Sequence, residues 1–248
     1  MSTFTLKIIA IIAMLIDHTG AILFPGEMTF RIIGRIAFPI FVFLLVEGFY
    51  HTKNYKKYLT RMGIFALISE IPFDIGFYNY NYGEDFFKSL KAAFNSQAAA
   101  KTFIKRLLES QNVFFTLFIG LVLIYLFRMV ENKYEDKILL GNVLDALLTL
   151  AFCAIAIILR VDYGLGGILI IVAFYLFRGS KALLAISLFI LNGTVFKSNN
   201  QVTIQVFSIF SIVPIVFYNG KKGKNIKYLF YVFYPVHILV LYLISVIL

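Results

Sequence analysis

The chain has 248 residues, of which 60% are hydrophobic and only 15% are charged, and its formal net charge is +10. Soluble domains use about half apolar and a quarter charged residues, so this composition excludes a water-soluble globular protein. Most of the chain is instead expected inside a bilayer, where one helical crossing takes about 20 apolar residues.

Apolar runs separated by charged residues predict an all-α fold, a polytopic bundle of about nine transmembrane helices. We treat residues 1–248 as a single transmembrane domain. The expected spans are 6–24, 30–50, 58–78, 113–130, 138–159, 163–178, 181–196, 202–219 and 228–248. The sixth and seventh are short for a full crossing, so one of them is tilted, re-entrant or misplaced. Four prolines lie inside the runs and are expected to kink their helices: Pro39, Pro72, Pro214 and Pro235.

Residues 79–112 do not fit the pattern of apolar spans. Aromatic and aliphatic residues recur there at helical spacing with lysines between them, which is typical of an amphipathic helix on a membrane surface. We interpret the segment as an amphipathic, extramembrane insert. A mobile loop is the alternative.

The distribution of lysine and arginine predicts the orientation. With the N-terminus in the cytoplasm, the inner loops hold about twice as many basic residues as the outer loops, as the positive-inside rule requires. Basic loops that face an anionic leaflet account for the net charge, so the chain needs no nucleic acid as a partner. The lipid bilayer is its first expected partner.

Ionisable side chains gather in the first three spans, although each of them costs several kcal/mol inside hydrocarbon. One pair lies late in the first span, one early in the second and one late in the third. Because consecutive spans run in opposite directions, all three pairs are expected in the outer half of the membrane. The six residues are Asp17, His18, Arg31, Arg35, Glu70 and Asp74.

Spacing suggests how these groups pair. Arg31 and Arg35 are four residues apart, as are Glu70 and Asp74, so each pair projects from one helical face. Two guanidinium groups that face two carboxylates predict a bidentate network. Such a network either belongs to a site or only holds three helices together, and both interpretations stay open.

His18 beside Asp17 is the strongest candidate for chemistry. A histidine next to a buried acid and within reach of two arginines is where a general base near neutral pH would be built, the alternative being a merely hydrogen-bonded buried imidazole. His237 follows Pro235 in the last span and lines the same cavity or is a core histidine. The three histidines are scattered along the chain, which argues against a metal site.

Eight short motifs make the chain resemble a known family. It resembles the TraX family in LKIIA at 6–10 and MLIDHTG at 14–20, and then in RIIGRIAFPIF at 31–41, EGF at 47–49, LISEIPFD at 67–74, QNVFFTL at 111–117, DYG at 162–164 and FYPVH at 233–237. The family takes its name from a conjugation protein that acetylates pilin, and it is similar to the wider transmembrane acyltransferases. The resemblance implies acetyl transfer from acetyl-CoA, with His18 at the position of a membrane-embedded histidine that acts in this reaction. The stretch from Glu84 to Glu109 is not part of the pattern.

Together these features predict a bacterial cytoplasmic-membrane acetyltransferase that moves an acetyl group from acetyl-CoA to an amine or hydroxyl of a protein, glycan or small molecule. His18 is the expected base, Asp17 or Glu70 orients it, and an arginine of the second span stabilises the oxyanion. The basic inner loops 53–61 and 221–227 are predicted to hold the donor's phosphates, although the positive-inside rule explains their cations equally well. Five lysines of these loops are the named candidates: Lys53, Lys56, Lys57, Lys221 and Lys222. A transporter or flippase with a buried charge relay is the alternative, and a non-catalytic scaffold is a third.

Overall fold

A computed structural model describes residues 1–198, 201–202, 204–224 and 227–248. The described chain is helical apart from a pair of antiparallel two-residue strands, β1 (Lys197–Ser198) and β2 (Gln201–Val202), so the predicted all-α class is confirmed. The helices are α1 (Thr3–Ile22), α2 (Met28–Gly34), α3 (Ala37–His51), α4 (Tyr55–Tyr82), α5 (Phe86–Asn95), α6 (Gln97–Leu107), α7 (Val113–Lys133), α8 (Ile138–Ile158), α9 (Gly164–Leu176), α10 (Lys181–Thr194), the 3₁₀ helix η1 (Ile204–Ser211), α11 (Ile212–Val216) and α12 (Lys227–Ile247).

Helix length and composition make the chain an integral membrane protein. Five described segments are long and apolar enough to cross a bilayer: α1, α2 with α3, α7, α8 and most of α12. At 28 residues α4 is the longest helix, although its charged residues lower its hydropathy. The expected sixth and seventh spans correspond to α9 and α10, which have 13 and 14 residues and are indeed short. The eighth is also short and changes from 3₁₀ to α-helix within the run, which the sequence analysis did not anticipate.

The second span is broken rather than merely kinked. Helix α2 ends at Gly34, and α3 begins at Ala37, two residues before Pro39. Proline has no N–H to donate to the carbonyl four residues earlier, which here belongs to Arg35, and it is tolerated only in the first turn of a helix. The break therefore falls just before Pro39 and exposes polar backbone beside Arg35.

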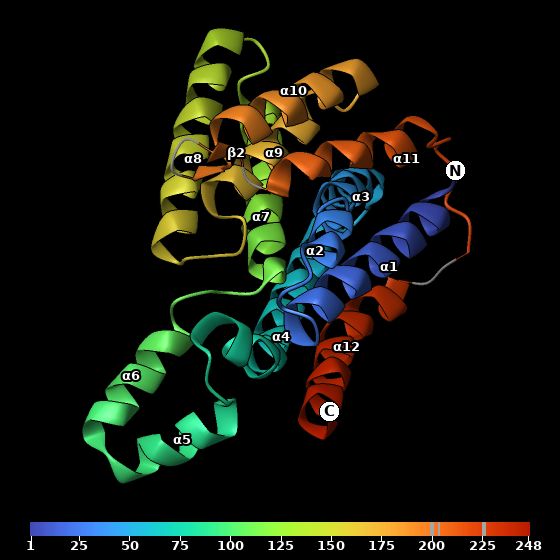
Figure 1. The fold of residues 1–248 in the computed structure, drawn as a ribbon. Helices are drawn as coiled ribbons and strands as arrows, with labels where there is room; N and C mark the ends of the chain where they lie inside the picture. The colour runs from blue at the N-terminus through green and yellow to red at the C-terminus, as the bar shows by residue number, and fades with distance from the viewer. Residues whose placement is uncertain (199–200, 203, 225–226) are drawn as a thin grey trace.

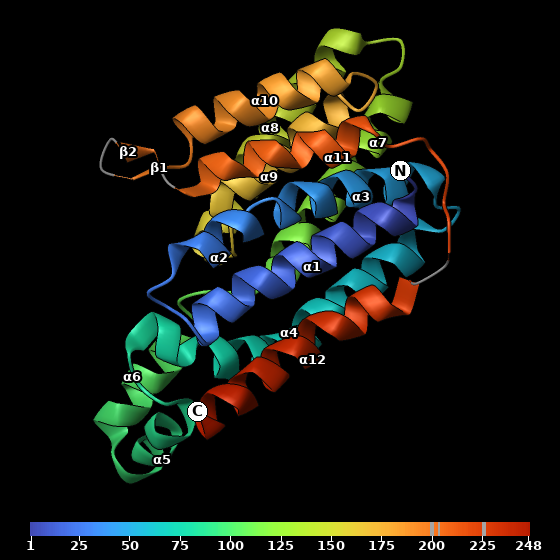
Figure 2. The same ribbon diagram turned by 45° about the vertical axis from the view of Figure 1, so that its right-hand side comes forward.

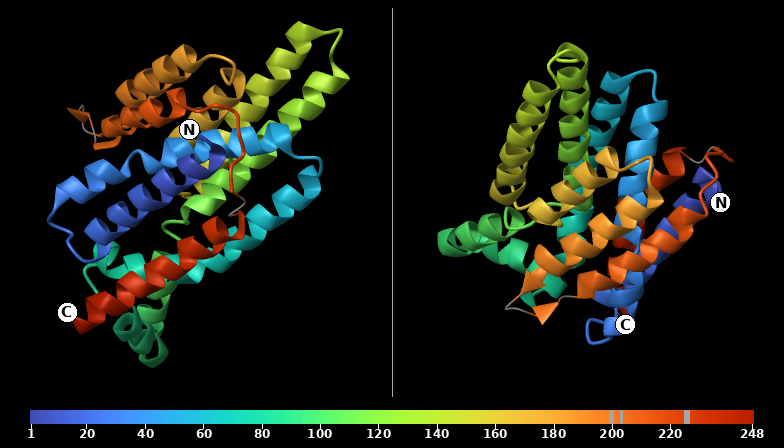
Figure 3. Two further views of the ribbon diagram at one scale, coloured as in Figure 1. Left: turned by 90° about the vertical axis from the view of Figure 1, so that its right-hand side faces the viewer. Right: turned by 90° about the horizontal axis from the view of Figure 1, so that it is seen from above.

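The central helices run side by side through the molecule. Helix α1 lies between α2–α3 on one side and α12 on the other, and α4 packs against both α12 and α7 (Figures 2 and 3). Helices α7, α8 and α9 form a second group above them (Figure 1). The N-terminus is fastened to the segment before α12, because the N–H groups of Thr3 and Phe4 donate to the carbonyls of Lys221 and Lys222 at 2.8 and 3.2 Å. This backbone pairing brings the first and last helices together.

Within the predicted insert 79–112, only the helical pair α5 and α6 stands away from the bundle (Figure 1), whereas residues 79–82 end α4 and Asn112 is buried. The two helices carry exposed apolar side chains such as Phe94 and Ile104 beside their lysines, so the expected amphipathic character is present. One end is anchored by Arg106, which donates to Glu84 at 2.5 Å and to the Tyr78 hydroxyl at 3.3 Å. Its placement on a membrane surface stays a prediction.

The Arg106–Glu84 pair predicts a pH effect on this anchor. Hydrogen bonding from Arg106 lowers the pKa of Glu84, so the pair stabilises the anchor above the usual carboxyl range near pH 4.3 and loses that effect as the pH falls through the lowered pKa. We expect faster amide exchange in residues 86–107 at acid pH, after correction for intrinsic exchange rates. Glu84→Gln should show faster exchange already at neutral pH, whereas Glu135→Gln in an exposed loop should not. Equal exchange in wild type and Glu84→Gln would contradict the anchor.

Candidate functional site

The side chain of His18 meets that of His237. Nδ1 of His18 lies 2.7 Å from Nε2 of His237, and Nδ1 of His237 lies 2.7 Å from the carbonyl oxygen of Phe233, one turn earlier in α12. The ring of His18 also makes edge contacts with Phe77 of α4 and Tyr234 of α12, at centroid distances of 5.0 and 5.9 Å. The imidazole is thus held by three helices, and His237 is its direct partner.

Both arginines of the second span pair with Asp17. Arg31 reaches one carboxylate oxygen of Asp17 at 2.6 Å, and Arg35 pairs with the other. Arg35 also donates Nε to the carbonyl of Arg31 at 3.0 Å. All three side chains are largely buried, and Gly34 lies directly against Asp17, so that a Cβ at Gly34 would collide with its carboxylate. The missing side chain at Gly34 lets α1 and α2 approach closely enough for the cluster to form.

The predicted pairing of these arginines with Glu70 and Asp74 is wrong. Glu70 instead accepts hydrogen bonds from the backbone and side-chain nitrogens of Asn112, the residue before α7. Asn112 caps α7 through the N–H of Phe114 at 2.9 Å, so Glu70 is fixed to the start of that helix. The expectation that Asp17 or Glu70 orients His18 is not met either, because the hydrogen-bond partners of both carboxylates lie elsewhere.

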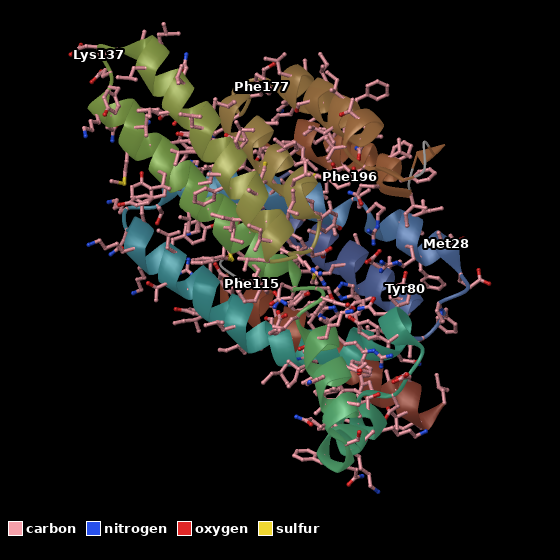
Figure 4. The ribbon with its side chains drawn as sticks, turned by 90° about the vertical axis from the view of Figure 1, so that its left-hand side faces the viewer. Met28, Tyr80, Phe115, Lys137, Phe177 and Phe196 are labelled. Carbon is pink, nitrogen blue, oxygen red and sulfur yellow. The ribbon has the colours of Figure 1, made fainter. Side chains whose placement is uncertain are left out.

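A cavity of about 200 Å³ opens over this cluster, and we call it the histidine cavity. Asp17 and His18 both line it, although adjacent residues on a helix point about 100° apart. Its lining residues do not include Glu70, Asp74 or His237, so His237 is the hydrogen-bonded core histidine of the two predicted possibilities. Four predicted site residues, from α1 and from α2 with the residue after it, do line it: Asp17, His18, Arg31 and Arg35. Figure 4 shows Tyr80, another lining residue, near the same end of the molecule as Met28, far from Lys137.

A loop that was not predicted as part of the site also contributes to this cavity. Asp162 and Tyr163 both line it, and Gln111 joins them from the residues just before α7. Gln111 and Asp162 are tied by backbone hydrogen bonds, in which the Asp162 N–H donates to the Gln111 carbonyl at 2.9 Å. Tyr163 has φ +62°, a costly conformation for a non-glycine residue, and its ring stacks on Phe38 at 3.8 Å. The family motif DYG at 162–164 is the sequence feature that could have pointed to this loop.

A second cavity, of about 540 Å³, lies at the opposite ends of α1 and α4, and we call it the basic cavity. Of the five lysines proposed for donor phosphates, Lys222 lines it, whereas the other four do not. Arg61 and Lys224, which belong to the predicted loops 53–61 and 221–227, also line it, and so does Lys7, which was not predicted as a donor ligand. They come from α1, α4 and the segment before α12, which are far apart in the sequence.

Arg61 is the notable cation of the basic cavity. Its guanidinium lies between the rings of Tyr58 and Tyr231, at 5.3 and 5.2 Å from their centroids. Its Nε is buried without a hydrogen-bond partner, and no carboxylate forms an ion pair with it within the part of the chain that the structure describes. A cation held in this way is suited to bind an anion that enters the cavity.

Phe41 is a lining residue of both cavities. Its ring lies 4.7 Å from that of Phe230, which in turn contacts Phe114 at 5.7 Å, and Phe114 meets Tyr234 edge-on at 5.0 Å. These rings come from α3, α7 and α12. The two cavities are therefore neighbours that share an aromatic wall.

A comparison with known families identifies the chain. A family model described as TraX protein matches residues 2–245. The chain belongs to the TraX family. This confirms the resemblance drawn from the sequence, and the TraX match includes every residue of both cavities.

Two relatives give partial matches to this TraX protein. The first, from Dichelobacter nodosus, is named probable fimbrial assembly protein FimC, serogroup H1; it is 46% identical over 77 residues, 29% of this chain and 31% of the relative. The second, uncharacterized protein RP591 of Rickettsia prowazekii (strain Madrid E), is 46% identical over 66 residues, 27% of this chain and 25% of the relative. The matches thus span less than a third of each relative. No solved structure matches the chain.

Proposed function

We propose that this TraX protein is an acetyltransferase of the bacterial cytoplasmic membrane, with its N-terminus in the cytoplasm. It moves an acetyl group from acetyl-CoA to an amine or hydroxyl of a pilin-like protein, a glycan or another envelope acceptor. The observation that carries the proposal is a histidine that lines a polar cavity, beside a second cavity lined by cations. A relative named for fimbrial assembly supports an acceptor of the cell envelope.

In this proposal His18 is the general base. It removes a proton from the acceptor's amine or hydroxyl as that atom attacks, a role that contributes about 10²–10⁴-fold to a rate. Arg31 or Arg35 stabilises the negative charge that develops on the acetyl oxygen, since both guanidinium groups line the histidine cavity. Asp17 holds the two arginines in position rather than orienting His18.

The basic cavity has the properties that the donor requires. Acetyl-CoA supplies the activated thioester, and its phosphates need cations that lack other strong partners. Arg61 fits this requirement because its buried Nε is unsatisfied within the described residues, and Lys222 and Lys224 line the same cavity. A volume of about 540 Å³ lies within the usual range of ligand pockets. Because Phe41 lines both cavities, the acetyl end of a donor in the basic cavity has this aromatic wall between it and the histidine cavity.

The proposal predicts weaker donor binding in Arg61→Met. Methionine keeps much of the apolar volume between the two tyrosines but removes the charge-assisted hydrogen bonds, worth about 1.5–3 kcal/mol. We expect the Kd for acetyl-CoA to rise about 10–100-fold. Radiolabelled acetyl-CoA binding to purified protein in nanodiscs is the measurement, with Lys137→Gln, which lines neither cavity, as the control. Unchanged affinity in Arg61→Met would contradict this donor site.

Transfer itself is tested with the same preparation. Labelled acetyl-CoA is incubated with two acceptor probes, a peptide with a free N-terminal amine and a short oligosaccharide. Covalent label on either probe supports the enzyme, and the labelled probe identifies amine or hydroxyl chemistry. If acetyl-CoA does not bind and neither probe is labelled, the alternative of a transporter or flippase is favoured.

A further inference from the structure

We propose that His237 is a positioning residue that sets the tautomer of His18 and makes Nε2 of His18 the proton-accepting atom. The role of His237 in catalysis rests on the proposed function. The positions of the protons on the two imidazole rings do not depend on it. The family motif FYPVH contains His237 but implies no role for this residue.

The tautomers follow from the hydrogen bonds in order. The carbonyl oxygen of Phe233 can only accept, so Nδ1 of His237 must carry a proton and donate it. In a neutral ring the other nitrogen is then an acceptor, so Nε2 of His237 accepts from Nδ1 of His18 at 2.7 Å. Nδ1 of His18 therefore carries its proton, and Nε2 keeps its lone pair.

The surroundings hold His18 in this arrangement. His237 is buried, and its ring lies nearly parallel to that of Phe233 at 4.6 Å and to that of His18 at 4.8 Å. Phe77 closes another side of the His18 ring. The adjacent Asp17 cannot replace His237, because both of its carboxylate oxygens are occupied by arginines.

This arrangement balances the proton through the reaction. As the acceptor nitrogen or oxygen bonds to the acetyl carbon, Nε2 of His18 takes the acceptor's proton, and when the carbon–sulfur bond breaks the same atom gives that proton to the departing thiolate. Nδ1–H of His18 stays bonded to His237 throughout. A neutral imidazole partner stabilises the imidazolium by a hydrogen bond without adding a second buried carboxylate to the site.

Two substitutions at His237 separate positioning from packing. His237→Gln keeps an acceptor, its side-chain carbonyl, whereas His237→Phe keeps the stacked ring and removes the acceptor. We expect His237→Phe to lower kcat about 10²-fold with little change in the KM for acetyl-CoA, and His237→Gln to recover most of kcat. Thr149→Val, which removes a comparable bond to a carbonyl one turn earlier in α8, is the matched control and should leave kcat unchanged.

A spectroscopic test does not depend on activity. The protein is labelled with ¹⁵N-histidine, and the ring nitrogens of its three histidines are assigned with single variants. In neutral wild-type protein we expect His18 and His237 to be protonated at Nδ1, and His18 to lose this preference in His237→Phe.

The results can be interpreted separately. A His18 ring protonated at Nε2 in the wild type, or equal kcat in folded His237→Phe and His237→Gln, would overturn the proposal. If no acetyl transfer is found while His18 is protonated at Nδ1, the positioning role of His237 stands and the proposed function fails.

Discussion

Replacing His18 with alanine is expected to lower the rate of acetyl transfer by about 10²–10⁴-fold, since a methyl group cannot take the acceptor's proton. The substitution strands no charge, because Asp17 keeps both of its arginine partners. The protein should therefore insert and fold. Single-turnover transfer from bound labelled acetyl-CoA to the acceptor probe is the measurement, because it isolates the chemical step from donor binding.

Donor affinity provides the control for this variant. His18 lines the histidine cavity but not the basic cavity, so His18→Ala should bind acetyl-CoA with the Kd of the wild type. His18→Asn, which fills more of the lost volume, should be equally slow. Transfer at the wild-type rate by either folded variant would exclude His18 as the base.

The location of the site could be predicted from the sequence because antiparallel spans alternate in direction. Asp17 lies late in α1 and Arg35 directly follows α2, so they had to lie at the same level, and both line the histidine cavity. Ionisable residues inside apolar runs are costly, which made them visible in the sequence. The depth of a residue in the membrane can thus be predicted from its position within its own span and the direction of that span.

The partner of each residue could not be predicted in this way. Pairing depends on how each helix is rotated about its axis, and Glu70 of α4 faces Asn112 rather than α2. The break before Pro39 also changes the direction of Arg35 relative to α3. The spacing of two residues within one helix shows that they lie on the same face. It does not show which other helix packs against that face.

The residues of the basic cavity could not be singled out from the sequence, for a different reason. Lys7, Arg61 and Lys224 lie near span ends, where positive-inside residues are ordinary, so their type and position carry no distinguishing signal. What distinguishes Arg61 is its place between the rings of Tyr58 and Tyr231, a contact between the first two turns of α4 and of α12. Such a contact between distant segments requires the fold.

Replacing Asp17 with asparagine is expected to cost about 3–5 kcal/mol of stability, because Arg31 and Arg35 would both lose the carboxylate with which they form their ion pairs. Arg31→Met should cost less, because it leaves Asp17 and Arg35 as a balanced pair. Unfolding by titration with a denaturing detergent, followed by intrinsic tyrosine fluorescence, measures the order of the two variants. Greater loss of stability in Arg31→Met than in Asp17→Asn would contradict the cluster as described.

A triple variant separates holding helices together from taking part in the reaction. Asp17→Leu with Arg31→Met and Arg35→Met removes all three charges, and a buried ion cluster replaced by apolar residues is often neutral or stabilising by about 1–4 kcal/mol. We expect the triple variant to be more stable than Asp17→Asn and to bind acetyl-CoA, because the basic cavity is unchanged. Its transfer rate should nevertheless fall at least about 10²-fold, since no guanidinium remains to stabilise the oxyanion. A stable triple variant with wild-type transfer would mean that the cluster only joins α1 to α2.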